Sequence, residues 1–195
     1  MKKQVTVNLQ DIQSAYFIGI GGIGMSAIAR YLHSNGILVF GYDKTETLLT
    51  RKLAEEGMKI HYDEDPSQIP AGIDFLNYTP AVAAEHRELT HFRKEAYPVY
   101  KRAEVLGLIS RSRKTIAIAG THGKTTTSSI LTHLLHTAGI ACTAFLGGIA
   151  ENFGSNYVAG KEELVVVEAD EYDRSFLHLH PYYAAILSMD ADHLD

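Results

Sequence analysis

The chain has 195 residues, of which 46% are hydrophobic and 21% charged, with a formal net charge of −5 and one cysteine. This apolar content can bury a core, so a disordered or low-complexity chain is excluded. A single cysteine and the lack of a signal-peptide pattern argue against a small secreted domain. No apolar run reaches the ~18 residues of a membrane span, and the acidic balance disfavours nucleic acid. We expect a cytoplasmic protein without membrane or nucleic-acid partners, of undetermined oligomeric state.

Apolar runs of strand length alternate with amphipathic stretches of helix length, which is typical of an α/β fold with a parallel sheet. In the first half of the chain, the pattern predicts strands and helices over residues 15–20, 25–34, 37–43, 47–56 and 74–79. Three expected helices end in a glycine that is followed by an apolar residue, at Gly36, Gly57 and Gly139. A glycine there can adopt the left-handed conformation and turn the chain into the next strand.

A change of composition occurs near residue 110. Residues 98–110 predict a short strand and a helix, and a basic cluster at 111–114 precedes a new strand at 115–119. We place a domain boundary at this cluster, which predicts domains at 1–110 and 111–195. The alternative is that the cluster is a solvated loop within one continuous sheet.

A first glycine-rich loop follows the first expected strand and opens a helix. Gly19, Gly21 and Gly24 have the G-x-G-x-x-G spacing, which allows a tight turn, close approach of a diphosphate, and close packing of helix on strand. Asp43 ends the second strand, where the fingerprint places a ribose-binding carboxylate. The pattern does not distinguish a dinucleotide from a UDP-sugar. The alternative is a purely structural turn in which Asp43 caps a loop.

A second glycine-rich loop, GTHGKTT at residues 120–126, again lies between an apolar strand and a helix. This arrangement predicts a nucleotide triphosphate site, with Lys124 on the transferring phosphate and the Thr125 hydroxyl on Mg²⁺. The loop is shorter than the general G-x-x-x-x-G-K-[ST] pattern, because only two residues separate its glycines. Apolar residues of the following helix recur on one face, at Ile130, Leu131, Leu134 and Leu135.

Acidic residues follow a buried-looking strand that begins at residue 164. Four of the six residues from 168 to 173 are acidic, and in P-loop proteins a carboxylate at this position holds Mg²⁺. Spacing alone does not tell which of them binds the metal. A later strand over 183–189 leads to Asp192 and His193, which again places polar groups at a strand's carboxyl end.

The other histidines and the cysteine give weaker signals. His178 and His180 alternate in an expected extended segment, and His133 and His136 are three apart on a helix. Either pair could bind a metal, but no third ligand is evident, so we interpret both pairs as structural or solvent-facing. Cys142 lies in an expected apolar strand and is interpreted as a small core residue.

Two nucleotide-type loops in one chain are a specific combination, and they resemble those of the Mur ligases. The likeness is carried by residues 19–26, 102–104, 120–127, 168–176 and 192–193, and it extends along nearly the whole chain. It is strongest to the members of the family that join L-alanine to UDP-N-acetylmuramate.

The resemblance implies a three-domain ligase that uses ATP and Mg²⁺. A Rossmann-like domain would bind the UDP-sugar, and a central P-loop ATPase domain would bind ATP. Only the N-terminal part of the central domain is expected in this chain. A C-terminal domain for L-alanine is expected outside this chain. ATP would phosphorylate the lactyl carboxylate of UDP-N-acetylmuramate, and the amine of L-alanine would attack the acyl phosphate, in peptidoglycan precursor synthesis. The chain by itself is expected to bind UDP-sugar and to be inactive.

The resemblance also implies roles for single residues. Lys124, Glu168 and His193 would be catalytic, and the metal ligands would be Thr125, Glu168 and His193. ATP would contact Gly120, Thr121, His122, Gly123, Lys124, Thr125 and Thr126. The UDP-sugar would contact Gly19, Gly21, Gly22, Ile23, Gly24, Asp43, Arg102 and His122. The chain departs from the family pattern at Ser188, where an Asn is common, and at residues 79–81, where a Ser-Ser-Ala loop is common.

Other functions remain as alternatives. An NAD-dependent oxidoreductase would use the first loop but would leave Lys124 and Glu168 without a role. A non-catalytic nucleotide-binding module would use both loops without chemistry. A related ligase that attaches a recycled tripeptide to the same sugar shares the loop containing His122 but differs from this chain over residues 19–26.

Overall fold

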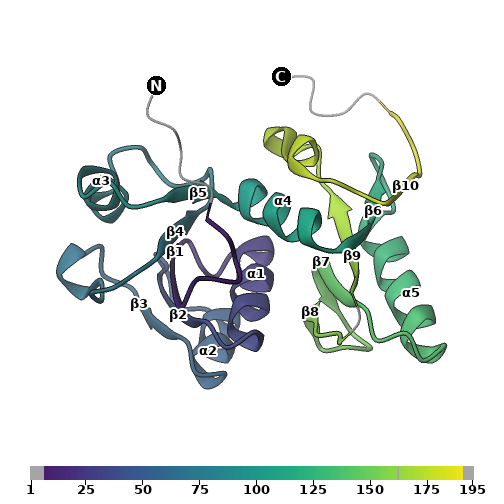
Figure 1. The fold of residues 1–195 in the computed structure, drawn as a ribbon, viewed down its shortest axis with the longest axis horizontal. Helices are drawn as coiled ribbons and strands as arrows, with labels where there is room; N and C mark the ends of the chain where they lie inside the picture. Colours follow the sequence, from purple (N-terminus) through teal and green to yellow (C-terminus); the bar gives the residue numbers. More distant parts are fainter. Residues whose placement is uncertain (1–6, 162, 191–195) are drawn as a thin grey trace. The chain divides into compact units, whose positions relative to one another are not determined.

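The computed structural model describes residues 7–161 and 163–190. The chain divides into two compact units, Met1–Val105 and Leu106–Asp195, and each contains its own sheet (Figure 1). The division falls inside helix α4 (Arg102–Ser112), a few residues before the boundary expected after residue 110. The predicted α/β class is confirmed, since most strands of both sheets run parallel.

The first unit is a five-stranded parallel sheet in the order β3-β2-β1-β4-β5. Its elements are β1 (Ser14–Ile18), α1 (Ile23–Ser34), β2 (Leu38–Tyr42), α2 (Leu48–Glu55), β3 (Lys59–His61), the 3₁₀ helix η1 (Pro66–Gln68), β4 (Phe75–Tyr78), α3 (Arg87–Lys94) and β5 (Val99–Lys101). Every residue of β1 is buried because this strand is central in its sheet.

The expected elements of the first unit are confirmed to within about two residues, as is usual for element ends. Three elements were not predicted, β3, α3 and the short 3₁₀ helix η1. Strand β3 has only three residues, and α3 is strongly polar, so neither gives a clear apolar pattern. The glycines at the ends of α1 and α2, Gly36 and Gly57, have φ values of 82° and 104°, as the turn prediction requires.

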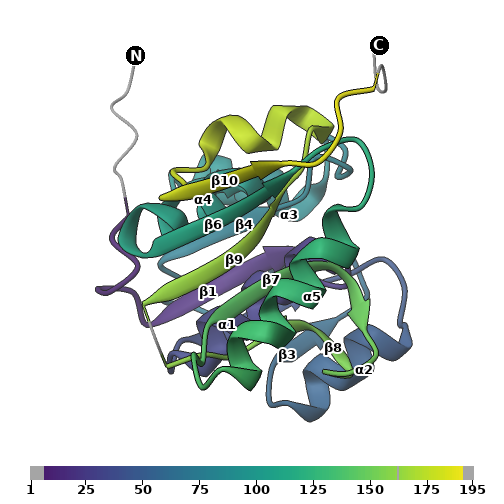
Figure 2. The same cartoon turned by 90° about the vertical axis from the view of Figure 1, so that its right-hand side faces the viewer.

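The second unit is a five-stranded sheet in the order β10-β6-β9-β7-β8 (Figure 2). Its elements, after α4, are β6 (Lys114–Ala119), α5 (Lys124–Thr137), β7 (Thr143–Ala150), β8 (Ser155–Val158), β9 (Leu164–Ala169), the 3₁₀ helix η2 (Tyr172–His178) and β10 (Tyr183–Ile186). Helix α5 packs on β6, β7 and β9. Only the pair β7–β8 is antiparallel among the strand pairs of the described residues.

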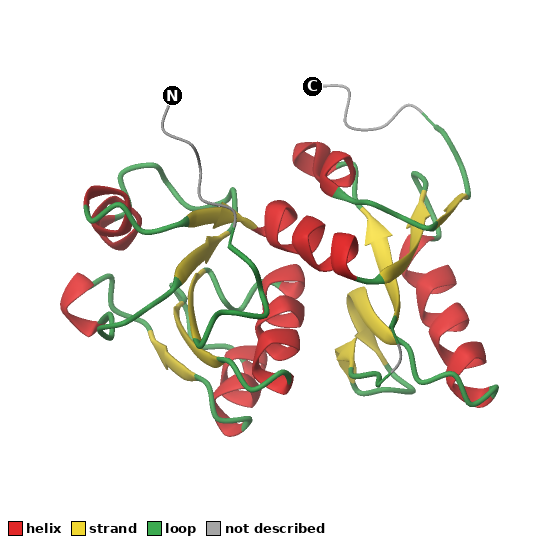
Figure 3. Ribbon diagram, in the orientation of Figure 1, coloured by secondary structure: helices red, strands yellow, loops and turns green. Residues whose placement is uncertain are grey.

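Several sequence predictions for this unit need correction. The alternative for the basic residues 111–114, a solvated loop within one continuous sheet, is wrong, because α4 continues through Ser112, β6 begins at Lys114 (Figure 3), and there are two sheets. The strand expected over 183–189 ends at Ile186. The apolar face expected on α5 is divided: Leu131 and Leu135 pack on a core cluster that includes Ala144 and Leu146, whereas Ile130 and Leu134 are 53% and 59% exposed.

The histidine and cysteine predictions have mixed outcomes. His178 ends η2, so His178 and His180 do not alternate along an extended segment. The chain coils there because the N–H of Phe176 donates back to the carbonyl of Asp170. Cys142 lies just before β7 rather than within a strand, but it is fully buried in the core. Burial raises the pKa of its thiol.

Candidate functional site

The second glycine-rich loop connects β6 to α5 at the carboxyl end of the parallel strands. Gly120 and Gly123 have φ values of 134° and 81°, which side-chain-bearing residues rarely adopt. The backbone N–H groups of Thr121 and His122 donate to Ser188, at its carbonyl (3.2 Å) and its hydroxyl (3.1 Å). Ser188, which departs from the family pattern, therefore helps to fix the loop. Among the described residues no side chain caps the N-terminus of α5, and such a terminus favours anions.

Lys124 is the first residue of α5, and its side chain folds back over the loop. Its Nζ donates to the carbonyl of Gly120 at 2.7 Å and to both carboxylate oxygens of Glu171, at 2.8 and 2.9 Å. The ammonium group thus lies over the loop, in which the N–H groups of Thr121 and His122 already donate to Ser188, so the predicted phosphate would meet the other N–H groups of the loop. That Lys124 contacts a transferring phosphate stays a prediction of the sequence.

Glu168 lies near the end of β9 and accepts hydrogen bonds from two neighbouring elements. Its Oε2 accepts from the Thr125 hydroxyl at 3.0 Å, and its Oε1 accepts from the Ser128 hydroxyl at 3.0 Å and the Gly147 N–H at 2.6 Å. A hydroxyl and a carboxylate oxygen side by side beneath a phosphate loop are hard oxygen donors of the kind that Mg²⁺ prefers. Glu168, one of the acidic residues that the sequence left open, thus contacts Thr125.

Two residues of this site were missed by the sequence analysis, Ser128 and Gly147. Ser128 follows Thr125 by three positions on α5, a spacing that puts both hydroxyls on one face of the helix and could have been read from the sequence. Gly147 lies in β7, 21 positions before Glu168. A Cβ atom at Gly147 would lie 2.5 Å from Oε2 of Glu168, so glycine is needed for this close approach.

The remaining predicted residues of this loop have different environments. His122 and Thr126 are exposed. The hydroxyl of Thr121 accepts from the N–H of Asp190 at 3.0 Å. His193, which is predicted to help hold a second Mg²⁺, lies outside the described residues, as does Asp192. His133 contacts Asn152 and Phe153, and the Nε2 of His136 lies 2.8 Å from the carbonyl oxygen of Cys142.

The first glycine-rich loop connects β1 to α1. Gly19 has a φ of 81°, and its N–H and that of Ile20 both donate to the carbonyl of Tyr42. The N–H of Gly21 donates to Oδ2 of Asp43 at 2.7 Å. The carboxylate predicted to contact a ribose therefore closes the loop onto β2, and these three N–H groups already have partners within the protein.

The N-terminus of α1 lies directly after this loop, with Gly22 as the N-cap and Ile23 as the first helical residue. Among the described residues no side chain caps it. The guanidinium of Arg102 packs against Gly24, because a Cβ at Gly24 would lie 2.8 Å from an Arg102 amino nitrogen. A helix N-terminus and a guanidinium group together favour a diphosphate. The structure thus brings together two residues, Gly24 and Arg102, that are far apart in the sequence.

A buried polar cluster lies elsewhere in the first unit, on the strand face that Tyr16 and Tyr42 share. The Tyr16 hydroxyl contacts His61 Nε2 at 2.5 Å and donates to Glu88 Oε2 at 2.8 Å, and the N–H of Asp65 donates to Glu88 Oε1. Burial raises the pKa of Glu88 to about 7, although the hydrogen bonds from Tyr16 and Asp65 act in the opposite direction. Burial and the adjacent Glu88 also raise the pKa of Tyr16.

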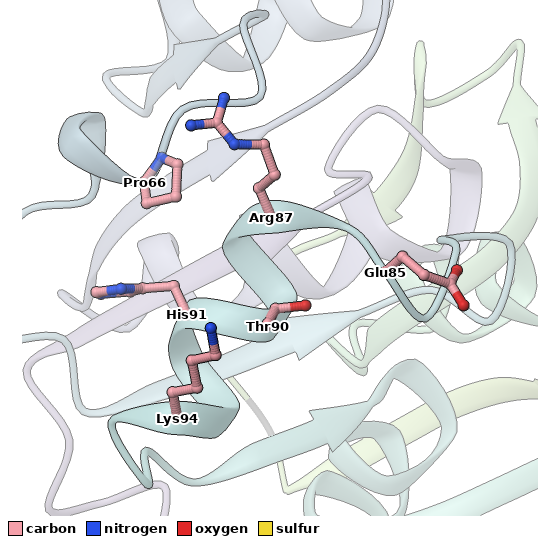
Figure 4. Close-up of a pocket in the computed structure, with 6 residues that line it drawn as sticks. All are labelled: Pro66, Glu85, Arg87, Thr90, His91 and Lys94. Carbon is pink, nitrogen blue, oxygen red and sulfur yellow. The ribbon is translucent and has the colours of Figure 1, made fainter.

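The described surface cavities do not coincide with the predicted site residues. One, of about 320 Å³, lies along the outer side of α3 (Figure 4) and is lined by Pro66, Glu85, Arg87, Thr90, His91 and Lys94. Another, of about 510 Å³, is lined in part by Arg111, Arg113, Lys114 and His180. Within the described ranges no helix is long and apolar enough to cross a bilayer, and no three potential metal-binding His, Cys, Asp or Glu residues gather.

The fold and the site define an α/β protein with two glycine-rich loops, each at the carboxyl end of an interior parallel strand. Residues 14–114 match the "Mur ligase family, catalytic domain", and residues 118–195 match the "Mur ligase middle domain". The chain belongs to the Mur ligase family, as the sequence resemblance predicted.

Two curated relatives show how far the similarity extends. The UDP-N-acetylmuramate–L-alanine ligase of Flavobacterium johnsoniae is 54% identical over 193 residues, which are 97% of this chain and 43% of the relative. The enzyme of the same name from Porphyromonas gingivalis is 53% identical over 190 residues, which are 94% and 42% of the two chains. The chain thus spans less than half the length of these relatives.

Solved structures of Mur ligases have the same fold. The UDP-N-acetylmuramate-alanine ligase MurC from Thermotoga maritima matches with a TM-score of 0.82 and 35% identity, over 89% of this chain and 40% of that one. A UDP-N-acetylmuramate:L-alanyl-γ-D-glutamyl-meso-diaminopimelate ligase from Neisseria meningitides matches with a TM-score of 0.86 and 26% identity, over 94% and 63%.

Proposed function

We propose that this chain supplies the UDP-sugar-binding and ATP-binding parts of a cytoplasmic ligase that joins L-alanine to UDP-N-acetylmuramate in peptidoglycan precursor synthesis. The observation that carries the proposal is the contact between Thr125 and Glu168 beneath the loop that bears Lys124. The names and high identity of the curated relatives support the choice of substrates.

In this proposal the second unit binds ATP and Mg²⁺. Thr125 and Glu168 hold one Mg²⁺, which neutralises charge on the phosphates and so favours transfer to the lactyl carboxylate of the sugar. Lys124 holds the phosphate that is transferred, and the backbone of residues 120–126 cradles the others. His193 helps to hold a second Mg²⁺, and His122 faces the muramoyl group. The amine of L-alanine then attacks the acyl phosphate and expels phosphate.

The first unit binds the UDP part of the sugar. The N-terminus of α1 and Arg102 supply positive charge for the diphosphate, and Gly19, Gly21, Gly22, Ile23 and Gly24 let it approach the backbone. Asp43 fixes the conformation of the loop through its hydrogen bond with the N–H of Gly21, and it contacts the UDP-sugar from there. The residues that bind adenine and L-alanine are expected outside this chain, so the chain by itself binds UDP-sugar without forming an amide.

The tripeptide-attaching ligase is the nearest competing function. The high TM-score of the Neisseria meningitides structure supports a shared fold, but its identity is only 26%, against 54% for the alanine ligase of Flavobacterium johnsoniae. Sequence similarity at this level favours L-alanine as the acceptor.

Calorimetric titration of this chain with UDP-N-acetylmuramate, with NADH as the comparator, tests the first part of the proposal. Binding of the UDP-sugar and not of NADH is expected, and tighter binding of NADH would favour an oxidoreductase. In the full-length ligase, Lys124→Ala should abolish amide formation while UDP-sugar binding is retained, since the two loops lie in different units. Near-native turnover by this variant would refute the role of Lys124, and turnover with an acceptor other than L-alanine would refute the proposed substrate.

A further inference from the structure

The ammonium group of Lys124 has all of its hydrogen-bonding capacity engaged within the protein. It has three N–H donors, and they meet the two carboxylate oxygens of Glu171 and the carbonyl of Gly120 at 2.7 to 2.9 Å. The Lys124 and Glu171 side chains are only 15% and 31% exposed, which weakens the screening of this ion pair by water. An incoming phosphate can therefore reach Lys124 only by displacing one of these acceptors, and Glu171 holds two of the three donors.

Backbone hydrogen bonds fix the segment that presents Glu171. The carbonyl of Glu171 accepts from the N–H of Arg174, and the carbonyl of the preceding Asp170 accepts from the N–H of Phe176. Arg174 has a φ of 52°, an unfavourable conformation for a residue with a side chain. The tight turn thus holds Glu171, three residues beyond Glu168, in a position from which its carboxylate reaches Lys124. Glu168 contacts Thr125.

We propose that Glu171 is a positioning residue, which holds Lys124 over the phosphate loop and yields it to the incoming nucleotide triphosphate. Nucleotide binding is then an exchange of one anion for another at Lys124. Two anions cannot share the ammonium closely without repulsion. The Glu171 carboxylate therefore lowers the affinity for nucleotide, while it keeps the lysine in place and neutralises its charge. This inference rests on the proposed ATP-binding function.

A competing role for Glu171 is contact with Mg²⁺. In that case the carboxylate would strengthen nucleotide binding, and only when the metal is present. The two roles therefore predict opposite signs for the effect of removing the charge, and measurements with and without Mg²⁺ distinguish them. A merely structural role would lower the unfolding temperature and could not tighten nucleotide binding.

The test is calorimetric titration of the full-length ligase with AMP-PNP, a non-hydrolysable ATP analogue, with Mg²⁺ and with EDTA. Glu171→Gln should tighten binding about threefold to tenfold under both conditions, as expected for loss of a partly exposed charged contact. Glu171→Asp, whose carboxylate cannot reach as far, should tighten binding to a smaller extent. The matched control is Glu163→Gln, which removes an exposed carboxylate before β9 and should bind as the wild type does.

The outcomes separate the two levels of the proposal. Unchanged affinity in both Glu171 variants would overturn the exchange at Lys124, and weaker binding only with Mg²⁺ would assign Glu171 to the metal instead. If the wild-type protein does not bind AMP-PNP under either condition, the proposed ATP-binding function fails first. Thermal unfolding of each variant shows whether it is folded. If Glu171→Gln does not fold, the affinity of Glu171→Asp decides between the outcomes.

Discussion

The backbone N–H of Gly147 donates a 2.6 Å hydrogen bond to Oε1 of Glu168, and this contact joins β7 to β9 beneath the phosphate loop. The Cα of Gly147 approaches so closely that a Cβ atom would lie 2.5 Å from Glu168 Oε2 and 3.0 Å from the Thr125 hydroxyl. The space between the two proposed metal ligands is therefore kept open by the absence of a side chain.

We expect Gly147→Ala to push the Glu168 carboxylate away from Thr125. The concentration of Mg²⁺ needed for half-maximal ligase activity should rise by about 10-fold to 100-fold, the usual effect of disturbing the groups that orient a metal ligand. The measurement is a Mg²⁺ titration of activity in the full-length ligase. Gly148→Ala is the matched control, because its Cβ would meet Thr125 Cγ2 at an ordinary 3.5 Å; an equal effect of both variants would refute the argument.

The Ser128 hydroxyl should orient Glu168 in a similar way. Ser128 is fully buried, and its hydroxyl donates to Glu168 Oε1 at 3.0 Å. Ser128→Ala removes this donor without adding bulk, so the Mg²⁺ requirement should rise roughly 10-fold, with little change in UDP-sugar binding. Ser129→Ala, the next residue on α5, should behave as the wild type in the same titration. A wild-type Mg²⁺ requirement for Ser128→Ala would show that the remaining donors suffice.

Arg102 should contribute to UDP-sugar affinity through charge. Because its guanidinium packs against Gly24 at the N-terminus of α1, Arg102→Ala should weaken UDP binding by about tenfold, as expected for loss of a charge-assisted hydrogen bond. The loss should be smaller at high salt, and calorimetry of this chain measures it. Arg51→Ala removes an exposed arginine that pairs with Glu46 and serves as the control. Equal affinities for both variants would exclude Arg102 from the site.

Glu88 should make the first unit less stable as the pH rises. Burial raises its pKa to about 7, whereas an unfolded glutamate titrates near 4.3. Between these values the folded protein holds a proton that the unfolded chain releases, so stability falls with rising pH and levels off above pH 7. Over the whole interval between the two pKa values this group should account for about 3 to 4 kcal/mol of that fall, at ~1.4 kcal/mol for each pH unit.

Glu88→Gln imitates the protonated carboxyl and does not titrate, so its stability relative to the wild type should rise by about 2 to 3 kcal/mol between pH 5 and pH 8. Urea unfolding at pH 5, 6, 7 and 8 measures the difference. Glu95→Gln, an exposed change at the end of the same helix, should keep the wild-type slope. A Glu88→Gln variant whose stability parallels the wild type across this range would mean that Glu88 is already ionised in the folded protein at pH 5.

Local sequence patterns were sufficient for the elements that carry the two loops. Strand β1 is mainly apolar, and the glycines after it require a turn into a helix. The same holds for β6 and the loop before α5. The polar helix α3 was missed because its helical signal depends on only three buried residues, Glu88, Leu89 and Phe92, and a glutamate does not read as a core residue.

The sequence by itself determined the α/β class, both glycine-rich loops and the family, because strand periodicity and glycine turns are properties of neighbouring residues. The tertiary structure decided which acid faces which partner. Glu168 meets Gly147 and Ser128 across 21 and 40 positions, and Lys124 meets Glu171 across 47. These contacts exist because β9 lies between β6 and β7 in the sheet, an order that follows from packing of the whole unit and not from the spacing of any segment.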